Sequence, residues 1–115
     1  MSTLLSLSRP FVADHYHDLP GFVEARHGHN WEAEATFAIQ EGSLEDACAA
    51  ALDAWVRQVD YTLLNQQASL QGRNPTAELL AGWLFQFLEE VGRPATRVRI
   101  REKANYWAAC SRQDS

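Results

Sequence analysis

The sequence predicts an α+β fold, in which a four-stranded antiparallel sheet carries two helices on one face. Two observations lead to this prediction. Near both ends of the chain, apolar residues alternate with polar ones, as they do in half-buried strands. Between those parts, two segments repeat apolar residues every three to four positions, as amphipathic helices do. The order is ββααββ, and 115 residues suit a single domain covering residues 1–115.

The first strand is predicted over residues 3 to 14. Leu5, Leu7 and Phe11 alternate with smaller or polar residues there. Pro10 cannot donate a hydrogen bond to a neighbouring strand, so it should lie at an edge, a bulge or a bend. After the strand, residues 14 to 18 read as a loop that ends in a turn at Leu19-Pro20-Gly21.

The second strand is predicted from His27 to Gln40. Its alternation puts His27 and His29 on one face, about 6.5–7 Å apart along the backbone. The parity of the first strand carries His15 onto the apolar face, and the end of one strand neighbours the start of the next in an antiparallel pair. The three imidazoles could therefore share one metal ion. The alternative is that His27 and His29 are polar residues at a strand entrance, bonded to loop carbonyls.

The first helix is predicted to end near Val59. Ser43 is a good N-cap, and Asp46 stands at the capping-box position. Cys48 lies on the apolar stripe, where it should be a small core residue. Because Cys48 and Cys110 are far apart and have no metal-type spacing, they indicate a reducing compartment.

The second helix should start at Asn74-Pro75, with Asn as the cap and Pro at the first helical position. Gly92 and Pro94 should end it.

Two short strands complete the predicted fold, over residues 96–102 and 106–110. Val98 and Ile100 should point into the core. The alternating arginines should then form a solvated or subunit-facing surface, which we favour over an anion site: Arg97, Arg99 and Arg101.

Charge and hydropathy exclude several classes of partner. The net charge is −5 with no basic cluster, which argues against a nucleic-acid partner. No segment is apolar over a length that could span a membrane, and the N-terminus lacks the pattern of a signal peptide. We therefore expect a cytoplasmic protein without a membrane partner.

Several motifs occur together along nearly the whole chain. They are Phe11-x-Ala13-x-His15, His27-Gly28-His29, Asp60 followed by Leu64-Asn65, Asn74-Pro75-Thr76 with Glu78, and Glu102 in the third long strand. In this combination the chain resembles the 6-pyruvoyltetrahydropterin synthase / 6-carboxytetrahydropterin synthase family, whose members have the tunnelling fold.

The resemblance implies a site as well as a fold. In that family the three histidines bind zinc, which here are His15, His27 and His29. The late glutamate clamps the pterin ring, which implies that Glu102 and the motif residue Thr76 bind substrate. Three imidazoles leave zinc an open position, as in catalytic sites. The resemblance also implies a homotrimer or homohexamer with sites between subunits. On the residues alone, Glu102 would be an exposed strand-end residue paired with an arginine.

Two positions depart from the family pattern. The usual catalytic cysteine falls on Val23, and the usual Asp-His pair reads Asp60-Tyr61. Glu24 is the nearest ionisable residue to the missing cysteine, so the catalytic candidates are Glu24, Asp60 and Tyr61. On the residues alone, Asp60 is equally a carboxylate that caps a helix end, and Tyr61 is a packing residue.

The resemblance implies a zinc-dependent lyase that acts on 7,8-dihydroneopterin triphosphate. The expected product is 6-carboxy-5,6,7,8-tetrahydropterin, on the queuosine (7-deazapurine) route. One alternative is a catalytically degenerate paralogue that binds Zn²⁺ and a pterin without standard turnover. Another is a 6-pyruvoyltetrahydropterin synthase.

Overall fold

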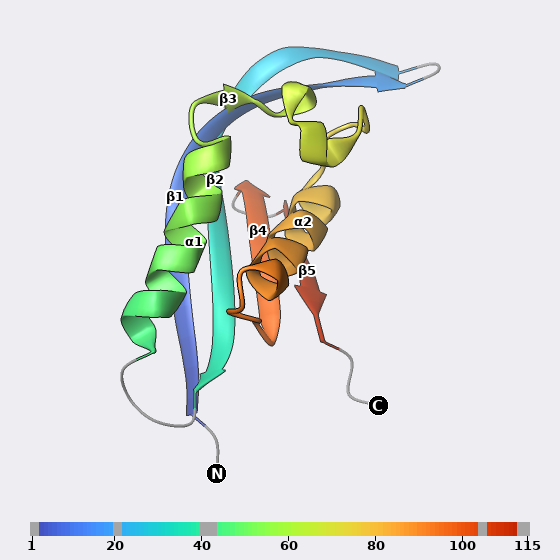
Figure 1. The fold of residues 1–115 in the computed structure, drawn as a ribbon. Helices are drawn as coiled ribbons and strands as arrows, with labels where there is room; N and C mark the ends of the chain where they lie inside the picture. Colours follow the sequence, from blue (N-terminus) through green and yellow to red (C-terminus); the bar gives the residue numbers. More distant parts are fainter. Residues whose placement is uncertain (1–2, 20–21, 40–43, 104–105, 113–115) are drawn as a thin grey trace.

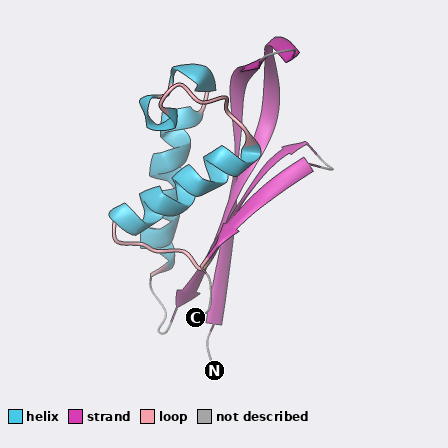
Figure 2. Cartoon of the chain, turned by 90° about the vertical axis from the view of Figure 1, so that its right-hand side faces the viewer, coloured by secondary structure: helices cyan, strands magenta, loops and turns pink. Residues whose placement is uncertain are grey.

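The computed structural model describes residues 3–19, 22–39, 44–103 and 106–112. Its elements are β1 (Thr3–Leu19), β2 (Phe22–Ile39), α1 (Glu45–Val59), β3 (Thr62–Leu63), the 3₁₀ turns η1 (Leu64–Gln66) and η2 (Ala68–Leu70), α2 (Ala77–Glu90), β4 (Arg97–Lys103) and β5 (Tyr106–Ser111). The sheet order is β3-β1-β2-β4-β5. Both helices lie on one face of the sheet (Figures 1 and 2), so the predicted α+β architecture is confirmed.

The strand count differs from the prediction. The four long strands are antiparallel neighbours, and β3 adds a fifth strand of two residues, parallel to β1 at Ala13 and Asp14. The connection after α1 forms this short strand because Asp60 and Tyr61 bond to the backbone of Val12, which brings the chain alongside β1.

The core lies between the sheet and the helices. Four alternate residues of β2 are 2% exposed or less: Trp31, Ala33, Ala35 and Phe37. Phe11 stacks on Trp31 and meets Trp55 of α1 edge to face, with ring centroids 5.8 and 5.7 Å away. Cys48 is buried among these apolar residues, as predicted, and this burial raises the pKa of its thiol.

The first hairpin is longer than predicted. Residues 14 to 18 were expected to be a loop, but β1 continues through them to Leu19, with an irregularity in register between His15 and His17. The side-chain amide of Asn65 accepts the N–H of Tyr16 and donates to its carbonyl, both at 3.0 Å. The Asn65 side chain thus makes the two backbone hydrogen bonds that a neighbouring strand would otherwise make with Tyr16. Pro20, Gly21 and Gln40 lie outside the described residues.

The start of each helix differs from the prediction. Leu44 caps α1 without a side-chain hydrogen bond, and the predicted cap, Ser43, lies outside the described residues. The cap of α2 is Thr76, whose hydroxyl accepts the N–H of Leu79 at 3.1 Å, so the predicted start at Asn74-Pro75 is wrong. Gly92, at φ 79°, follows the end of α2 as predicted.

The face of the sheet away from the helices is polar. Arg99 and Arg101 of β4 pair with Glu34 and Glu32 of β2, each at 3.1 Å. The Arg99 guanidinium also lies 5.9 Å from the ring centre of Trp107. These ion pairs fit the prediction of a strand surface rather than an anion site.

No helix in the described part of the chain is both long enough and apolar enough to cross a bilayer.

Candidate functional site

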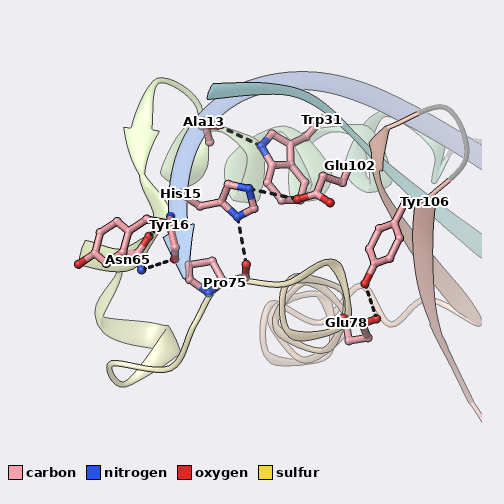
Figure 3. Close-up of polar contacts among 9 residues, drawn as sticks. All are labelled: Ala13, His15, Tyr16, Trp31, Asn65, Pro75, Glu78, Glu102 and Tyr106. Atoms are coloured by element: carbon pink, nitrogen blue, oxygen red, sulfur yellow. Dashed lines mark hydrogen bonds and ion pairs between the residues drawn. The ribbon is translucent and has the colours of Figure 1, made fainter. Parts of the chain in front are cut away.

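His15 is the one buried polar or charged residue among those the structure describes, with 1% of its surface exposed. Its Nδ1 lies 3.1 Å from the carbonyl oxygen of Pro75 (Figure 3). Because a carbonyl only accepts, Nδ1 carries the proton. The Nε2 atom lies 3.1 Å from Oε1 of Glu102. The edge of the ring packs on Trp31 at 5.1 Å, and the Trp31 indole N–H donates to the Ala13 carbonyl, which fixes this wall of the site.

The strand register places the other two histidine positions opposite this site. His27 pairs with His15, and His29 pairs with Ala13, two residues before His15. Directly opposed residues share a face of a sheet, so positions 15, 27 and 29 lie on one face, as predicted. The side chains of His27 and His29 lie outside the described residues. Among the described side chains, no three ligand-type groups converge.

The donor chemistry of His15 fits a metal ligand. A histidine that ligates a metal through one nitrogen usually donates its other ring N–H to a carbonyl or a carboxylate. The bond from Nδ1 to Pro75 is of this kind. It leaves Nε2 as the nitrogen that a metal would use.

Glu102 stands at the end of β4, and its side chain is 12% exposed. It faces His15, so the expectation from the residues alone, that Glu102 is an exposed strand-end residue, is wrong. A buried carboxylate requires a compensating partner. Glu102 is therefore part of the His15 site.

A second carboxylate, Glu78, lies at the start of α2. Tyr106 of β5 donates its hydroxyl to Glu78 at 3.2 Å (Figure 3). The pKa of Glu78 is lowered, first by its own backbone N–H and then by bonds from Thr76 and Tyr106. The Glu78 carboxylate in turn raises the pKa of Tyr106. This contact ties β5 to the helix that follows Pro75. Sequence reasoning missed Tyr106, because no motif signals its partner.

Asp60 and Tyr61 lie at the edge of β1, on the side away from β2. The Asp60 carboxylate accepts the N–H of Val12 at 2.9 Å, and the Tyr61 N–H donates to the Val12 carbonyl at 2.6 Å. Asp60 therefore has the helix-end role that was one of its two alternatives. Tyr61 has φ 57° and is 82% exposed, so the packing alternative for Tyr61 is wrong. It borders a small groove of about 180 Å³ with Asp14 and Leu63.

The remaining site candidates are Thr76, whose side chain the structure describes, and Glu24, of which it describes only the backbone. Thr76 caps α2, and its hydroxyl also contacts Glu78, so it has a structural role whether or not it binds substrate. The backbone of Glu24 lies opposite that of His17, beyond the irregularity in the hairpin. The side chains of Val23 and Glu24 lie outside the described residues.

A larger groove, about 770 Å³, runs along α2 between Arg73 and Glu90. Its lining includes Glu78 but neither His15 nor Glu102, so it is not the His15 site.

Comparisons with known proteins agree on one family. Residues 5–113 match the sequence model of the family described as 6-pyruvoyl tetrahydropterin synthase. No protein of curated function matches the sequence significantly.

Solved structures show the same fold at low sequence identity. The 6-pyruvoyl tetrahydropterin synthase of Caenorhabditis elegans is 16% identical, with a TM-score of 0.83, and the match covers 98% of this chain and 97% of that one. A Plasmodium vivax 6-pyruvoyltetrahydropterin synthase, in a variant that replaces a catalytic glutamate by alanine, is 14% identical with a TM-score of 0.71 over 99% of both chains. The Plasmodium falciparum enzyme is 14% identical with a TM-score of 0.67, over 96% and 98%.

Proposed function

Because the chain belongs to the 6-pyruvoyl tetrahydropterin synthase family, we propose that it is a zinc-dependent pterin synthase-type lyase. Its substrate is 7,8-dihydroneopterin triphosphate, and its product is 6-carboxy-5,6,7,8-tetrahydropterin, on the queuosine (7-deazapurine) route. The observation that supports this best is the buried His15, whose Nδ1 contacts the Pro75 carbonyl. The register of β1 and β2 places His15 on the same face of the sheet as positions 27 and 29.

In this proposal His15, His27 and His29 hold the zinc ion. Neutral imidazoles are common zinc ligands, and a three-histidine set is the kind that catalytic sites use. When bound, zinc supplies Lewis-acid polarisation of a substrate oxygen.

Glu102 and Thr76 bind the pterin in this proposal. A carboxylate can accept two parallel N–H bonds from the 2-amino group and N3 of the ring. The burial of Glu102 strengthens such bonds, because little water competes for the carboxylate.

Proton transfer is assigned to Glu24, with Asp60 and Tyr61 as the second candidate pair. The Plasmodium vivax relative has a glutamate as a catalytic residue, which supports Glu24. The Asp60 carboxylate already accepts the N–H of Val12, whereas the Tyr61 side chain is exposed. Tyr61 is therefore the more accessible proton donor of this pair.

A specific observation favours a second candidate function. Val23 cannot transfer a proton, and the Tyr61 side chain projects into solvent instead of toward the core. Both features fit a paralogue that binds Zn²⁺ and a pterin but no longer turns the substrate over. A 6-pyruvoyltetrahydropterin synthase is the remaining alternative for the product.

Product analysis separates these functions. Purified zinc-loaded protein is incubated with 7,8-dihydroneopterin triphosphate, and the product is identified by its mass. The 6-carboxy product supports our proposal, and the 6-pyruvoyl product supports the second enzyme. Binding of zinc and neopterin without any product establishes the binding-only paralogue.

Variants then identify the proton donors and acceptors. We expect Glu24→Gln to lose turnover more than Tyr61→Phe does. The double variant Cys48→Ser/Cys110→Ser should stay active, because Cys48 is enclosed in the core. Loss of activity in the double variant alone would contradict the assignment to Glu24 or to Asp60 and Tyr61.

We also propose a cytoplasmic location. Cys48 and Cys110 are both free cysteines. Free thiols persist in reducing compartments, which supports this location.

A further inference from the structure

One exposed aromatic residue lies on the face of the sheet that carries the His15 site. Among the described strand residues, three aromatic residues are exposed: Tyr16, Tyr106 and Trp107. Successive residues of a strand point to opposite faces. Tyr106 shares its face with Ala108 and Cys110, which pack against the core, so it lies on the side of the helices. Tyr16 follows the buried His15, and Trp107 follows Tyr106, so both belong to the opposite face.

A register shift in the β4–β5 ladder separates Tyr106 from Glu102. Arg101 pairs with Trp107, but Lys103 pairs with Tyr106, so β4 has one more residue than β5 at this point. In a regular ladder Tyr106 would lie directly opposite Glu102, with Cβ atoms about 4.5–5.5 Å apart. Irregularities of this kind redirect side chains and often occur beside functional sites. Here the shift places Tyr106 one position further along β4.

The side chains of Glu102 and Tyr106 consequently reach different elements (Figure 3). Glu102 contacts His15 of β1, whereas Tyr106 donates its hydroxyl to Glu78 of α2 at 3.2 Å. The hydrogen bond to Glu78 is the main cause that raises the pKa of Tyr106, and the charge of Glu102 raises it further, as expected of a neighbouring carboxylate. Although the Tyr106 hydroxyl has a partner, 43% of the residue is exposed. The ring is therefore held in place while its surface stays open.

A fixed, open ring beside a carboxylate suits a planar ligand. Glu102 can accept two parallel N–H groups from the edge of a heterocycle. Such a ligand still has two apolar ring faces, and an aromatic side chain covers one of them favourably. Tyr106 is held at its backbone by Lys103 and at its hydroxyl by Glu78. Because it is already ordered, it loses little conformational freedom when a ligand binds.

We propose that Tyr106 is a specificity-determining residue of the ligand site, and that its ring stacks on the planar heterocycle whose N–H edge Glu102 holds. This inference rests on the proposed function, because it takes the role of Glu102 from there. Glu102 selects the hydrogen-bonding edge of the ligand, and Tyr106 selects the flatness of its ring system. A fully reduced tetrahydropterin has a puckered ring, so it stacks less well than an oxidised pterin.

The test measures ligand binding rather than turnover. Neopterin is titrated calorimetrically into zinc-loaded wild type, Tyr106→Leu and Tyr106→Phe. Truncation of a stacking aromatic residue weakens the binding of a base about fivefold or more, and we expect at least this loss in Tyr106→Leu. Tyr106→Phe keeps the ring, so it should lose much less. Tyr106→Leu should bind tetrahydroneopterin almost as well as the wild type does, because the puckered ring gains little from stacking.

NMR supplies a signature that a purely structural role of Tyr106 would not produce. The ring current of a stacked aromatic side chain moves the resonance of a ligand proton upfield. We expect this shift for the C7 proton of neopterin in the wild type and in Tyr106→Phe. The shift should be much smaller in Tyr106→Leu.

Trp107→Leu is the matched control. Trp107 is the next residue of β5, is exposed to a similar extent, and lies on the other face of the sheet beside Arg99. Its replacement should leave the neopterin affinity and the C7 shift unchanged. Circular dichroism verifies that each variant is folded, and Tyr106→Val replaces Tyr106→Leu if that variant is not.

The outcomes separate this inference from the proposed function. Wild-type affinity and an unchanged C7 shift in Tyr106→Leu would overturn the inference alone. An equal loss of affinity in Trp107→Leu would also overturn it, because the effect would then not belong to one face. An equal loss in Tyr106→Phe would assign the effect to the bond with Glu78 instead of the ring. If the wild type does not bind neopterin, the proposed function fails together with the inference.

Discussion

Three separated parts of the chain hold His15 in place. The Pro75 carbonyl contacts its Nδ1, Trp31 packs against its ring, and Glu102 lies 3.1 Å from its Nε2. A residue buried to this extent and fixed on every side has one orientation available. At the scale of single residues, the His15 side chain is therefore oriented before any ligand arrives.

Removing a histidine ligand should remove the metal. We predict that His15→Ala and His29→Ala each lose bound zinc, because two imidazoles hold the ion far less tightly than three. Metal analysis of the purified variants measures this. His17→Ala, a change at the remaining histidine, should keep its zinc. Full zinc retention in both ligand variants would contradict the metal assignment.

Glu102→Gln should weaken pterin binding. The amide keeps the size of the side chain but replaces one acceptor oxygen with a donor, so the paired contact to the ring should lose at least ~2 kcal/mol, or about 30-fold in affinity. Calorimetric titration with neopterin measures the loss. Unchanged affinity would leave Glu102 without a role in ligand binding.

The Glu78–Tyr106 contact should depend on pH. The pKa of Glu78 is lowered in the folded protein, so its stabilisation is present at neutral pH and is lost as the pH falls through that lowered pKa. Tyr106→Phe should therefore lower the free energy of unfolding at pH 7, by less than ~1 kcal/mol because the pair is exposed. The difference should shrink at pH 3. Urea unfolding at both pH values measures it, with Tyr61→Phe as the exposed control. A difference that grows in acid would contradict this assignment.

At the scale of elements, the segment before α2 links the helix to the site. Pro75 reaches His15, Thr76 caps the helix, and Glu78 binds Tyr106. These three contacts act on β1, α2 and β5, so the start of α2 positions residues from three elements. A shift of this segment would move the Pro75 carbonyl that contacts His15.

Loss of the α2 cap should destabilise the protein. Thr76→Ala removes the acceptor for the Leu79 N–H, which typically costs ~1 kcal/mol. Thr76→Ser should restore most of the stability, because serine supplies the same oxygen. Urea unfolding measures both variants. If Thr76→Ala has wild-type stability but loses pterin affinity, Thr76 is a substrate residue rather than a cap.

At the scale of the whole molecule, the shape indicates missing neighbours. The radius of gyration is 14.8 Å, whereas a compact domain of this length has about 13 Å. The β1–β2 hairpin extends beyond the helix layer (Figure 1), which explains the difference. At one edge of the described sheet, β3 covers β1 only at Ala13 and Asp14, and at the other edge β5 exposes half of Trp107. Open edges of this kind invite pairing with another chain.

We therefore predict a homotrimer or a dimer of trimers, in which β1 of one subunit pairs with β5 of the next. Light scattering at micromolar concentration should give three or six times the mass of the chain, 13.0 kDa. A proline in place of Ala109 on β5 should weaken assembly, because it removes a donor from that strand, whereas Ala50→Ser on the exposed face of α1 should not. A monomeric wild type would contradict the prediction.

The sequence by itself determined the kinds of element and the faces that they bury. Alternation along β2 and the three-to-four spacing along α1 and α2 are local signals, so they predicted the buried face of each element. The same parity placed positions 15, 27 and 29 on one face. Burial is repeated along an element, and repetition is visible in a sequence.

Only the tertiary structure decided the individual polar partners. Asn65 hydrogen-bonds to the backbone of Tyr16 in β1, 49 residues away in the sequence. Tyr106 donates to Glu78, 28 residues away. Glu102 of β4 contacts His15 of β1, which lies in a distant part of the sequence. Each of these contacts is made once and depends on how distant segments pack. A single hydrogen bond leaves no periodic pattern in the sequence, so only the packed chain can determine it.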